Sequence, residues 1–446
     1  MLSKSARFST AALPVASKRV HQVLCPSNKI CGNFVNSQVR GFRAALLKDY
    51  DKPLVIEAQK RELKPKDDEI LVQVDSAGVN SPDIAFIRGS YHLRPKLPVV
   101  PGFELAGEVI ELGPKVSNFK VGDRVLGIKT HSQGAFAERC TLNVKAAYKI
   151  PHSLKYEIAA SIPVAYGTAY LALQEVGKVQ ENSTVLVLSS QGATGIACID
   201  LALNVYKCNV IAGAESEEKC ALVRPMGVQA TVEYTDENLP KLVKKITGGR
   251  GCDLIIDTVG GFWFDLALKS LRPGGHLITT GFSSNQVPTL TLSDLIAHRA
   301  TVSGIRLGGL AEDDRDHFHD IIDRLVDWQE QGYFQVLPPK QFNLDNINDA
   351  IDCVKNKKPF GKKKIRKFDD NLGPKMADTD EKVAADSAEK GKVRFQVSRT
   401  SNGQNVSSVV PHLERQQSVA AKTQDDDEPR DNQMPGLIIA LRTLML

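Results

Sequence analysis

One short stretch of this chain constrains its fold more than any other. Residues 185–188 form an aliphatic run typical of a buried strand, and residues 196–202 continue at helical spacing. Between them lies Ser189-Ser190-Gln191-Gly192-Ala193-Thr194-Gly195, a turn rich in small residues. This order predicts a cradle for the diphosphate of a dinucleotide, because small residues admit phosphate and the helix N-terminus offers unpaired N–H groups. A strand-to-helix turn with two chance glycines is the alternative, since Ser190 stands where the pattern usually has its first glycine.

Two patterns of secondary structure follow each other along the chain. Residues 44–166 alternate short strand-like runs with Gly and Pro, which predicts a compact β domain. From Thr168 onward, strands alternate with helices, and the expected strands are 185–188, 209–212, 254–257, 276–280 and 301–305. This alternation predicts a parallel sheet with right-handed crossovers. We expect helices at 315–331 and 344–355 to pack back on the first domain.

The net charge of +5 is unevenly placed. No Asp or Glu precedes Asp49, whereas that stretch holds eight Lys and Arg residues. The rest of the chain is therefore slightly acidic, which does not favour nucleic acid as a partner. Residues 1–42 resemble a mitochondrial transit peptide and predict a matrix location, with a basic disordered arm of a cytoplasmic protein as the alternative. No uninterrupted apolar run has the length of a membrane span.

The eight cysteines contain no CxxC pair and lie mostly in apolar runs, so we expect buried thiols rather than disulfides or a zinc site. Residues 369–446 contain one aromatic residue, Phe395, and are expected to form a disordered tail. Met376 begins a stretch that resembles the start of another protein, so a fused foreign segment is a hypothesis. Arg394-Phe395-Gln396-Val397 resembles the docking peptides of cation–chloride cotransporters, which bind Ste20-type kinases; a chance match is the alternative.

Further motifs occur in a fixed order around the glycine turn. They are Ala77-Gly78-Val79-Asn80-Ser81-Pro82-Asp83, Pro101-Gly102-Phe103-Glu104-Leu105-Ala106-Gly107, Val121-Gly122-Asp123-Arg124-Val125, Tyr166-Gly167-Thr168-Ala169-Tyr170 and Asp257-Thr258-Val259-Gly260-Gly261. Over about residues 43–361 the chain resembles the medium-chain dehydrogenase/reductase superfamily, in its zinc-free quinone oxidoreductase branch. The resemblance implies an α/β protein. A GroES-like partial β-barrel catalytic domain (43–165 and 306–368) would hold an inserted Rossmann domain (166–305) with a doubly wound parallel sheet.

The resemblance also implies roles for individual residues. Asn80, Asp83 and Tyr91 are the catalytic candidates: an amide at Asn80 could donate to a developing oxyanion, Asp83 could brace that loop, and Tyr91 could line the substrate cleft. Each has a structural alternative, namely a turn asparagine, a helix N-cap and simple aromatic packing. The candidates for cofactor binding are Asn80, Thr168, Ser190, Gly192, Ala193, Thr194, Gly195, Lys219, Tyr234, Gly260, Gly281 and Phe282.

The sequence favours NADPH over NADH and argues against zinc. The strand expected at 209–212 ends in uncharged Gly213 and Ala214, so no carboxylate is expected to repel a 2′-phosphate, although Glu215 is only one residue away. The pair Lys219 and Tyr234 resembles the pair that grips this phosphate in quinone oxidoreductases, and a solvated helix lysine is the alternative. Positions that carry a Cys and a His ligand in zinc relatives hold Asn80 and Phe103 here.

The resulting hypothesis is a zinc-independent, NADPH-dependent reductase of quinones or α,β-unsaturated carbonyls. The alternative is a catalytically silent, crystallin-like nucleotide-binding member of the same fold. Family members imply a homodimer through the edge strand at 301–305. One departure concerns the end of the fold: residues 361–367 are mostly charged, which predicts that the last barrel strand is missing or poorly paired.

Overall fold

The computed structural model describes residues 41–60, 62–129, 134–235, 237–356 and 361–366. All of these belong to one compact unit, Met1–Asp370. The expected transit peptide, the expected disordered tail and the docking motif at 394–397 lie outside the described residues, so those predictions stay open.

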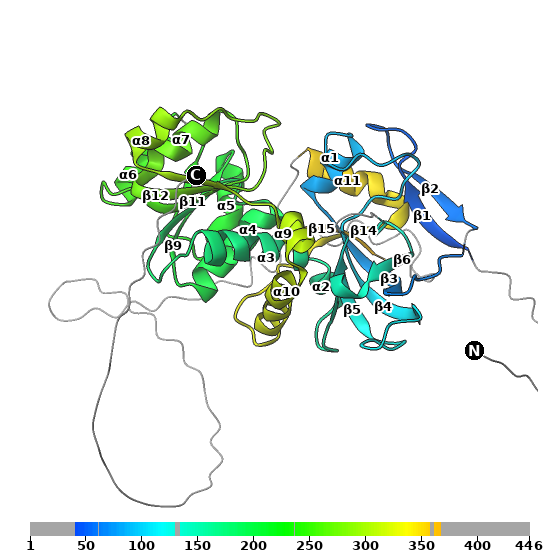
Figure 1. The fold of residues 1–446 in the computed structure, drawn as a ribbon. Coiled ribbons are helices and arrows are strands. Elements are labelled where there is room, and N and C mark those ends of the chain that lie inside the picture. The colour runs from blue at the N-terminus through cyan, green and yellow to red at the C-terminus, as the bar shows by residue number, and fades with distance from the viewer. Residues whose placement is uncertain (1–40, 61, 130–133, 236, 357–360, 367–446) are drawn as a thin grey trace, which may run out of the picture. The chain divides into compact units, whose positions relative to one another are not determined.

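The catalytic part is built on a seven-stranded sheet with the order β14-β15-β3-β4-β5-β7, in which β6 also pairs with β3. Every pair in it is antiparallel except β14 with β15. Two further strands, β1 (Phe42–Leu46) and β2 (Val55–Gln59), pair separately. The strands of the large sheet are β3 (Glu69–Val79), β4 (Glu104–Leu112), β5 (Arg124–Ile128), β6 (Arg139–Asn143), β7 (Ala147–Lys149), β14 (Lys340–Asn343) and β15 (Lys363–Arg366). This is the predicted GroES-like barrel, coloured blue to cyan in Figure 1 apart from β14 and β15.

The coenzyme part is a six-stranded sheet with the order β10-β9-β8-β11-β12-β13, and every neighbouring pair is parallel. The strands are β8 (Thr184–Val187), β9 (Asn209–Ala214), β10 (Ala230–Glu233), β11 (Cys252–Asp257), β12 (Leu271–Thr279) and β13 (Thr301–Gly304). Side chains alternate between the faces of a strand, so Val185 and Val187 join one core cluster and Leu186 and Leu188 another. Burial on both faces explains the continuous apolar runs and confirms the predicted parallel sheet.

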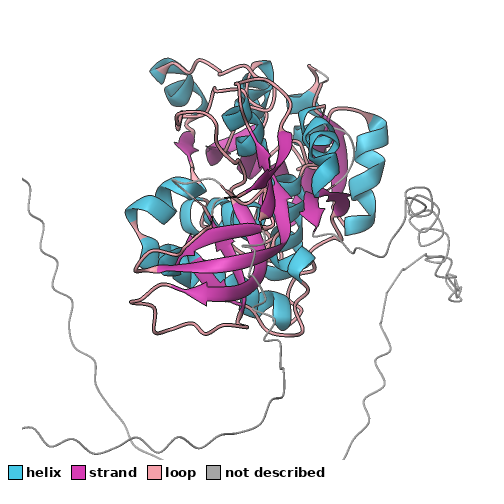
Figure 2. Cartoon of the chain, turned by 90° about the vertical axis from the view of Figure 1, so that its right-hand side faces the viewer, coloured by secondary structure: helices cyan, strands magenta, loops and turns pink. Residues whose placement is uncertain are grey.

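Helices pack around the strands of both sheets (Figure 2). The helices are α1 (Ser81–Ile87), α2 (Tyr156–Ala159), α3 (Pro163–Tyr170), α4 (Ala193–Asp200), α5 (Glu217–Val223), α6 (Leu239–Ile246), α7 (Phe262–Ser270), α8 (Leu292–His298), α9 (Leu307–Asp313), α10 (Arg315–Glu330) and α11 (Ile347–Lys355). Wider helical turns η2 (Leu171–Val176) and η3 (Leu201–Val205) extend α3 and α4, and single turns occur at η1 (Val144–Ala146), η4 (Arg224–Met226) and η5 (Leu344–Asn346). Within the described ranges, no helix combines the length and apolar character that crossing a bilayer requires.

Two predictions about strand ends are wrong. The last barrel strand is present, because β15 pairs with β14 on one side and β3 on the other, and its lysines are buried. The second Rossmann strand, β9, runs to Ala214 instead of residue 212, so that Glu215 follows it directly. An acidic residue therefore does stand at the end of this strand.

Candidate nucleotide and substrate site

The glycine turn joins β8 to α4 as a tight loop. Ser189 has φ +54°, and Gly192 caps α4, which begins at Ala193. A Cβ at Gly195 would lie 2.5 Å from the carbonyl oxygen of Ser189, so only glycine lets the helix pack this closely on the turn. The first-turn N–H groups of Ala193, Thr194 and Gly195 have no partner within the helix, which makes this end an anion site.

Four buried side-chain oxygens at the carboxyl edge of the parallel sheet, two of them in this turn, support a ligand along that edge. Ser190 Oγ, Gln191 Oε1, Thr279 Oγ1 and Ser283 Oγ are buried and have no hydrogen-bond partner among the described residues. Ser190 and Gln191 follow β8, while Thr279 ends β12 and Ser283 follows it. The carboxyl ends of parallel strands share one edge, and open α/β sheets bind ligands at that edge. Unpaired buried hydroxyl and amide groups fit the phosphates and ribose hydroxyls of a dinucleotide.

The other predicted cofactor residues differ in what surrounds them. Gly260 has φ +68°, and its N–H donates to the buried carboxylate of Asp257 at 3.0 Å. A Cβ at Gly260 would lie 2.6 Å from Cδ1 of Phe282, so glycine allows that ring to approach. Gly281 borders open space. On α3, Thr168 Oγ1 donates to the carbonyl of Val164 at 2.6 Å. The structure thus places Gly260, Gly281 and Phe282 together and uses the Thr168 hydroxyl within its own helix.

Three polar residues gather where β9 ends. Lys219 on α5 forms an ion pair with Glu215 rather than standing free. Tyr234 is fully buried, and its ring packs against Trp263 with centroids 5.8 Å apart. Burial and, second, the neighbouring Glu215 carboxylate raise the pKa of Tyr234. Lys219 and Tyr234, the predicted pair, therefore both lie beside Glu215. From the sequence, this acid was expected to lie further beyond the end of the strand.

Asn80 is the centre of a buried polar cluster in the catalytic part. Its Nδ2 donates to Glu104 Oε1 at 2.8 Å, and its Oδ1 accepts from Lys362 Nζ at 2.5 Å. Lys362 and Glu104 also form a buried ion pair with each other. The second carboxylate oxygen of Glu104 accepts from the backbone N–H of Val164, which fixes it against α3. The sequence prediction found Asn80 but missed Lys362 and Glu104, although both stood inside quoted motifs.

The remaining catalytic candidates lie beside this cluster. Asp83 is completely buried; its Oδ2 accepts from the backbone N–H of Asn80 at 2.8 Å, and its Oδ1 has no partner among the described residues. Burial, with a further contribution from the Glu104 charge, raises the pKa of Asp83 to about 8. Tyr91 is half-buried, with its ring edge-on to Phe103 at 5.2 Å between centroids. Asp83 thus stands in the first turn of α1, where its carboxyl group accepts from the backbone of the N-cap residue Asn80. Its role in bracing the loop for catalysis stays a prediction.

The residues at the two positions that bind zinc in zinc-containing relatives are poor metal ligands. An amide at Asn80 and a phenyl ring at Phe103 replace the thiolate and imidazole that zinc prefers. In the described part of the chain, no group of three His, Cys, Asp or Glu residues could hold a metal ion. The donor chemistry thus supports a zinc-independent site, which stays a prediction.

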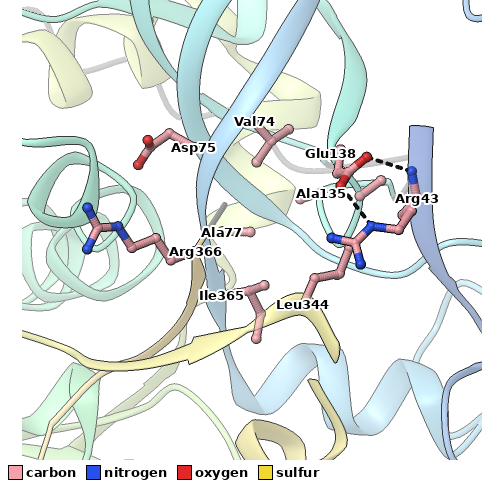
Figure 3. Close-up of a pocket in the computed structure, with 10 residues that line it drawn as sticks. Arg43, Val74, Asp75, Ala77, Ala135, Glu138, Leu344, Ile365 and Arg366 are labelled. Atoms are coloured by element: carbon pink, nitrogen blue, oxygen red, sulfur yellow. Dashed lines mark hydrogen bonds and ion pairs between the residues drawn. The ribbon is translucent and has the colours of Figure 1, made fainter. Parts of the chain in front are cut away.

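A separate hollow in the catalytic part lies between β1, β3 and β15 (Figure 3). Arg43 lines it and forms ion pairs with Glu138 at 2.9 Å and Asp345 at 3.2 Å. Ile365 and Arg366 of β15 line another part of its wall. Because Arg43 and Glu138, two of its charged lining residues, pair with each other, we assign the hollow a structural role.

Sequence profiles of two families match this architecture. The alcohol dehydrogenase GroES-like domain matches residues 66–152, and the zinc-binding dehydrogenase family matches residues 193–327. A GroES-like barrel joined to a dinucleotide-type parallel sheet defines a class of nicotinamide-dependent oxidoreductases. The chain belongs to this class, the medium-chain dehydrogenase/reductase superfamily.

Individual relatives lie in the quinone oxidoreductase branch. The chain is 36% identical over 324 residues to a quinone oxidoreductase-like protein 2 homolog of Nematostella vectensis, covering 72% of this chain and 88% of the relative. It is 36% identical over 334 residues to quinone oxidoreductase-like protein 2 of Mus musculus, covering 75% and 94%. A solved mycobacterial structure complexed with NADPH superimposes with a TM-score of 0.68 at 27% identity, covering 73% of this chain and 99% of that one.

Proposed function

We propose that this oxidoreductase uses NADPH, without zinc, to reduce a quinone or an α,β-unsaturated carbonyl. The observation that carries the proposal is the set of buried oxygens of Ser190, Gln191, Thr279 and Ser283 at the carboxyl edge of the parallel sheet, which have no hydrogen-bond partner among the described residues. A bound NADPH would supply the hydride. The N–H groups at the start of α4 would hold its diphosphate.

The chain's own residues would orient the acceptor and exclude water. The Asn80 amide has one Nδ2 hydrogen engaged by Glu104 and a second that can donate to a developing oxyanion. Tyr91 and Phe103 offer an aromatic surface to a planar substrate. These features support a quinone or enone acceptor. The names of the relatives and the NADPH complex of the mycobacterial neighbour point the same way.

The proposal is tested by NADPH oxidation with a panel of quinones, alkenals and enoyl thioesters, alongside calorimetry with NADPH and NADH. We expect saturable NADPH binding and turnover with at least one acceptor. Binding without turnover on the whole panel would instead support the catalytically silent, nucleotide-binding alternative. No saturable binding of either nucleotide would overturn both.

The segments outside the described residues carry separate proposals. We propose a mitochondrial matrix location, supported by the acid-free basic stretch before Asp49. A fluorescent fusion of residues 1–45 tests it, and diffuse cytosolic signal would contradict it. A kinase docking role for 394–397 requires the tail alone, so deleting residues 369–446 is expected to abolish kinase binding while reductase activity is unchanged.

A further inference from the structure

The Asn80 amide is held at both ends by charged groups. The Lys362 ammonium can only donate and the Glu104 carboxylate can only accept, so together they fix which way the amide points. Lys362 faces Oδ1 and Glu104 faces Nδ2, and all three side chains are buried. The pair therefore sets the direction of the remaining Nδ2 hydrogen. Without the ammonium, the amide could turn over or move away.

Lys362 is also tied to the nucleotide turn. The backbone N–H of the preceding residue, Gly361, donates to the carbonyl of Gln191 at 3.1 Å. Gln191 lies in the glycine turn, between Ser190 and the N-cap residue of α4. Gly361, which donates to the nucleotide turn, and Lys362, whose ammonium group binds Asn80, are thus neighbours in the chain. The two halves of the site, which are distant in sequence, meet at this point.

We propose that Lys362 is a positioning residue for the reaction: it orients the Asn80 amide and, through Gly361, links that amide to the nucleotide turn. The inference rests on the proposed function, because Asn80 matters only if a nucleotide and an acceptor meet beside it. Lys362 itself transfers no proton and touches no reacting atom. Its contribution is a fixed geometry at Asn80 when the turn is occupied.

Lys362→Met is the test, and Lys364→Met is the matched control. Both lysines are buried in the same short segment: Lys364 lies in β15 and Lys362 directly precedes that strand. Lys364 contacts Ser76 Oγ at 3.3 Å and Glu157 at 3.9 Å, away from Asn80. We expect Lys362→Met to lower kcat about tenfold or more with the KM for NADPH nearly unchanged. Lys364→Met should retain kcat, and Lys362→Arg should recover part of the loss.

A double-mutant cycle separates positioning from general damage. In an Asn80→Ala background, Lys362→Met should lower kcat no further, because the amide it orients is gone. An equal, additive loss in that background would overturn the proposal. So would a loss of kcat in Lys364→Met as large as that in Lys362→Met.

Hydrogen exchange gives a readout that does not depend on turnover. NADPH should slow amide exchange of a peptide covering residues 78–84 in the wild type and in Lys364→Met, but not in Lys362→Met, although calorimetry still shows NADPH binding. If Lys362→Met melts below the assay temperature, Lys362→Gln carries the same comparison. Protection that persists in the Lys362 variant would refute the link. A wild type that binds NADPH but reduces no acceptor would refute the proposed function, while the exchange result would still decide this inference.

Discussion

Two opposite charges compete at the adenosine end of the candidate nucleotide site. Glu215 follows β9 directly and pairs with Lys219, so the ammonium that could bind a 2′-phosphate is already partly neutralised. A carboxylate at this position also repels the phosphate and suits a ribose 2′-hydroxyl. Nucleotide choice therefore depends on the balance between these two side chains.

We expect Glu215→Gln to raise the ratio of kcat/KM for NADPH over NADH. Removing the negative charge frees Lys219 for the 2′-phosphate and ends the repulsion. A gain of about tenfold corresponds to ~1.4 kcal/mol. Steady-state kinetics with both nucleotides measures it, and Lys219→Met, as the control, should move the ratio the other way. An unchanged ratio in both variants would place the 2′-phosphate elsewhere.

Asp83 predicts a pH dependence of stability. Burial raises its pKa to about 8 in the folded protein, while the unfolded chain has the usual value near 3.8. Between these two pH values the folded state binds more protons at Asp83 than the unfolded state does. The contribution of Asp83 to the free energy of unfolding is therefore largest below about 3.8 and is lost as pH rises through about 8. Its ionisable neighbours Glu104 and Lys362 form an ion pair with each other.

Asp83→Asn should flatten this decline. The variant cannot ionise at this position, so its denaturant-unfolding free energy should fall less between pH 5 and pH 8. The difference in slope should approach ~1.4 kcal/mol per pH unit at most. Glu111→Gln on β4, which changes an acid away from this cluster, serves as the control. Parallel profiles for wild type and Asp83→Asn would contradict a neutral Asp83.

Among the elements, β15 shows best what the sequence could and could not predict. Apolar strands such as β8 and β11 were placed to within one and two residues, because continuous aliphatic runs indicate burial on both faces. A strand of lysines gives no such signal. The fold alone brings Glu157 near Lys364 of β15, and Glu104 near Lys362, which directly precedes the strand. For the same reason, nothing in the sequence indicated that Lys362 belongs to the site. Glu215 was noted in the sequence, but the strand before it was expected to end at residue 212, whereas β9 runs to Ala214.

The effect of burying a lysine in β15 can be tested at Lys363. Its Nζ donates to the carbonyl of Gly361 at 2.9 Å, and burial lowers its pKa to about 8. A lowered lysine pKa means that the unfolded state binds more protons between about 8 and 10.5, so this group makes the wild type more stable as pH rises through that window. Lys363→Met should therefore raise the melting temperature at pH 7, and its advantage should shrink by pH 10. A lower melting temperature at pH 7 would show that the lysine is stabilising.

At the scale of the whole molecule, the parallel sheet ends at β10 on one side and at β13 on the other. Among the described residues β13 pairs with β12 alone, and a strand edge of this kind can pair with another strand. Helix α8 comes just before β13 and presents Leu292 and Ile296, which are 80% and 77% exposed. They are four residues apart and so share one face of the helix. Val287, 74% exposed, lies in the segment that leads to this helix.

We expect this edge to bind a second copy of the chain. Joining two β13 strands would satisfy their free backbone groups and remove the α8 side chains from water, which is a self-complementary contact typical of a two-fold dimer. Light scattering after size exclusion should give a dimer for the wild type and a monomer for Leu292→Asp with Ile296→Asp. The matched control is Val121→Asp, since Val121 is 60% exposed but lies between β4 and β5 of the catalytic part. A monomeric wild type would refute this, whereas reductase activity in a monomeric double variant would show that each copy holds a complete site.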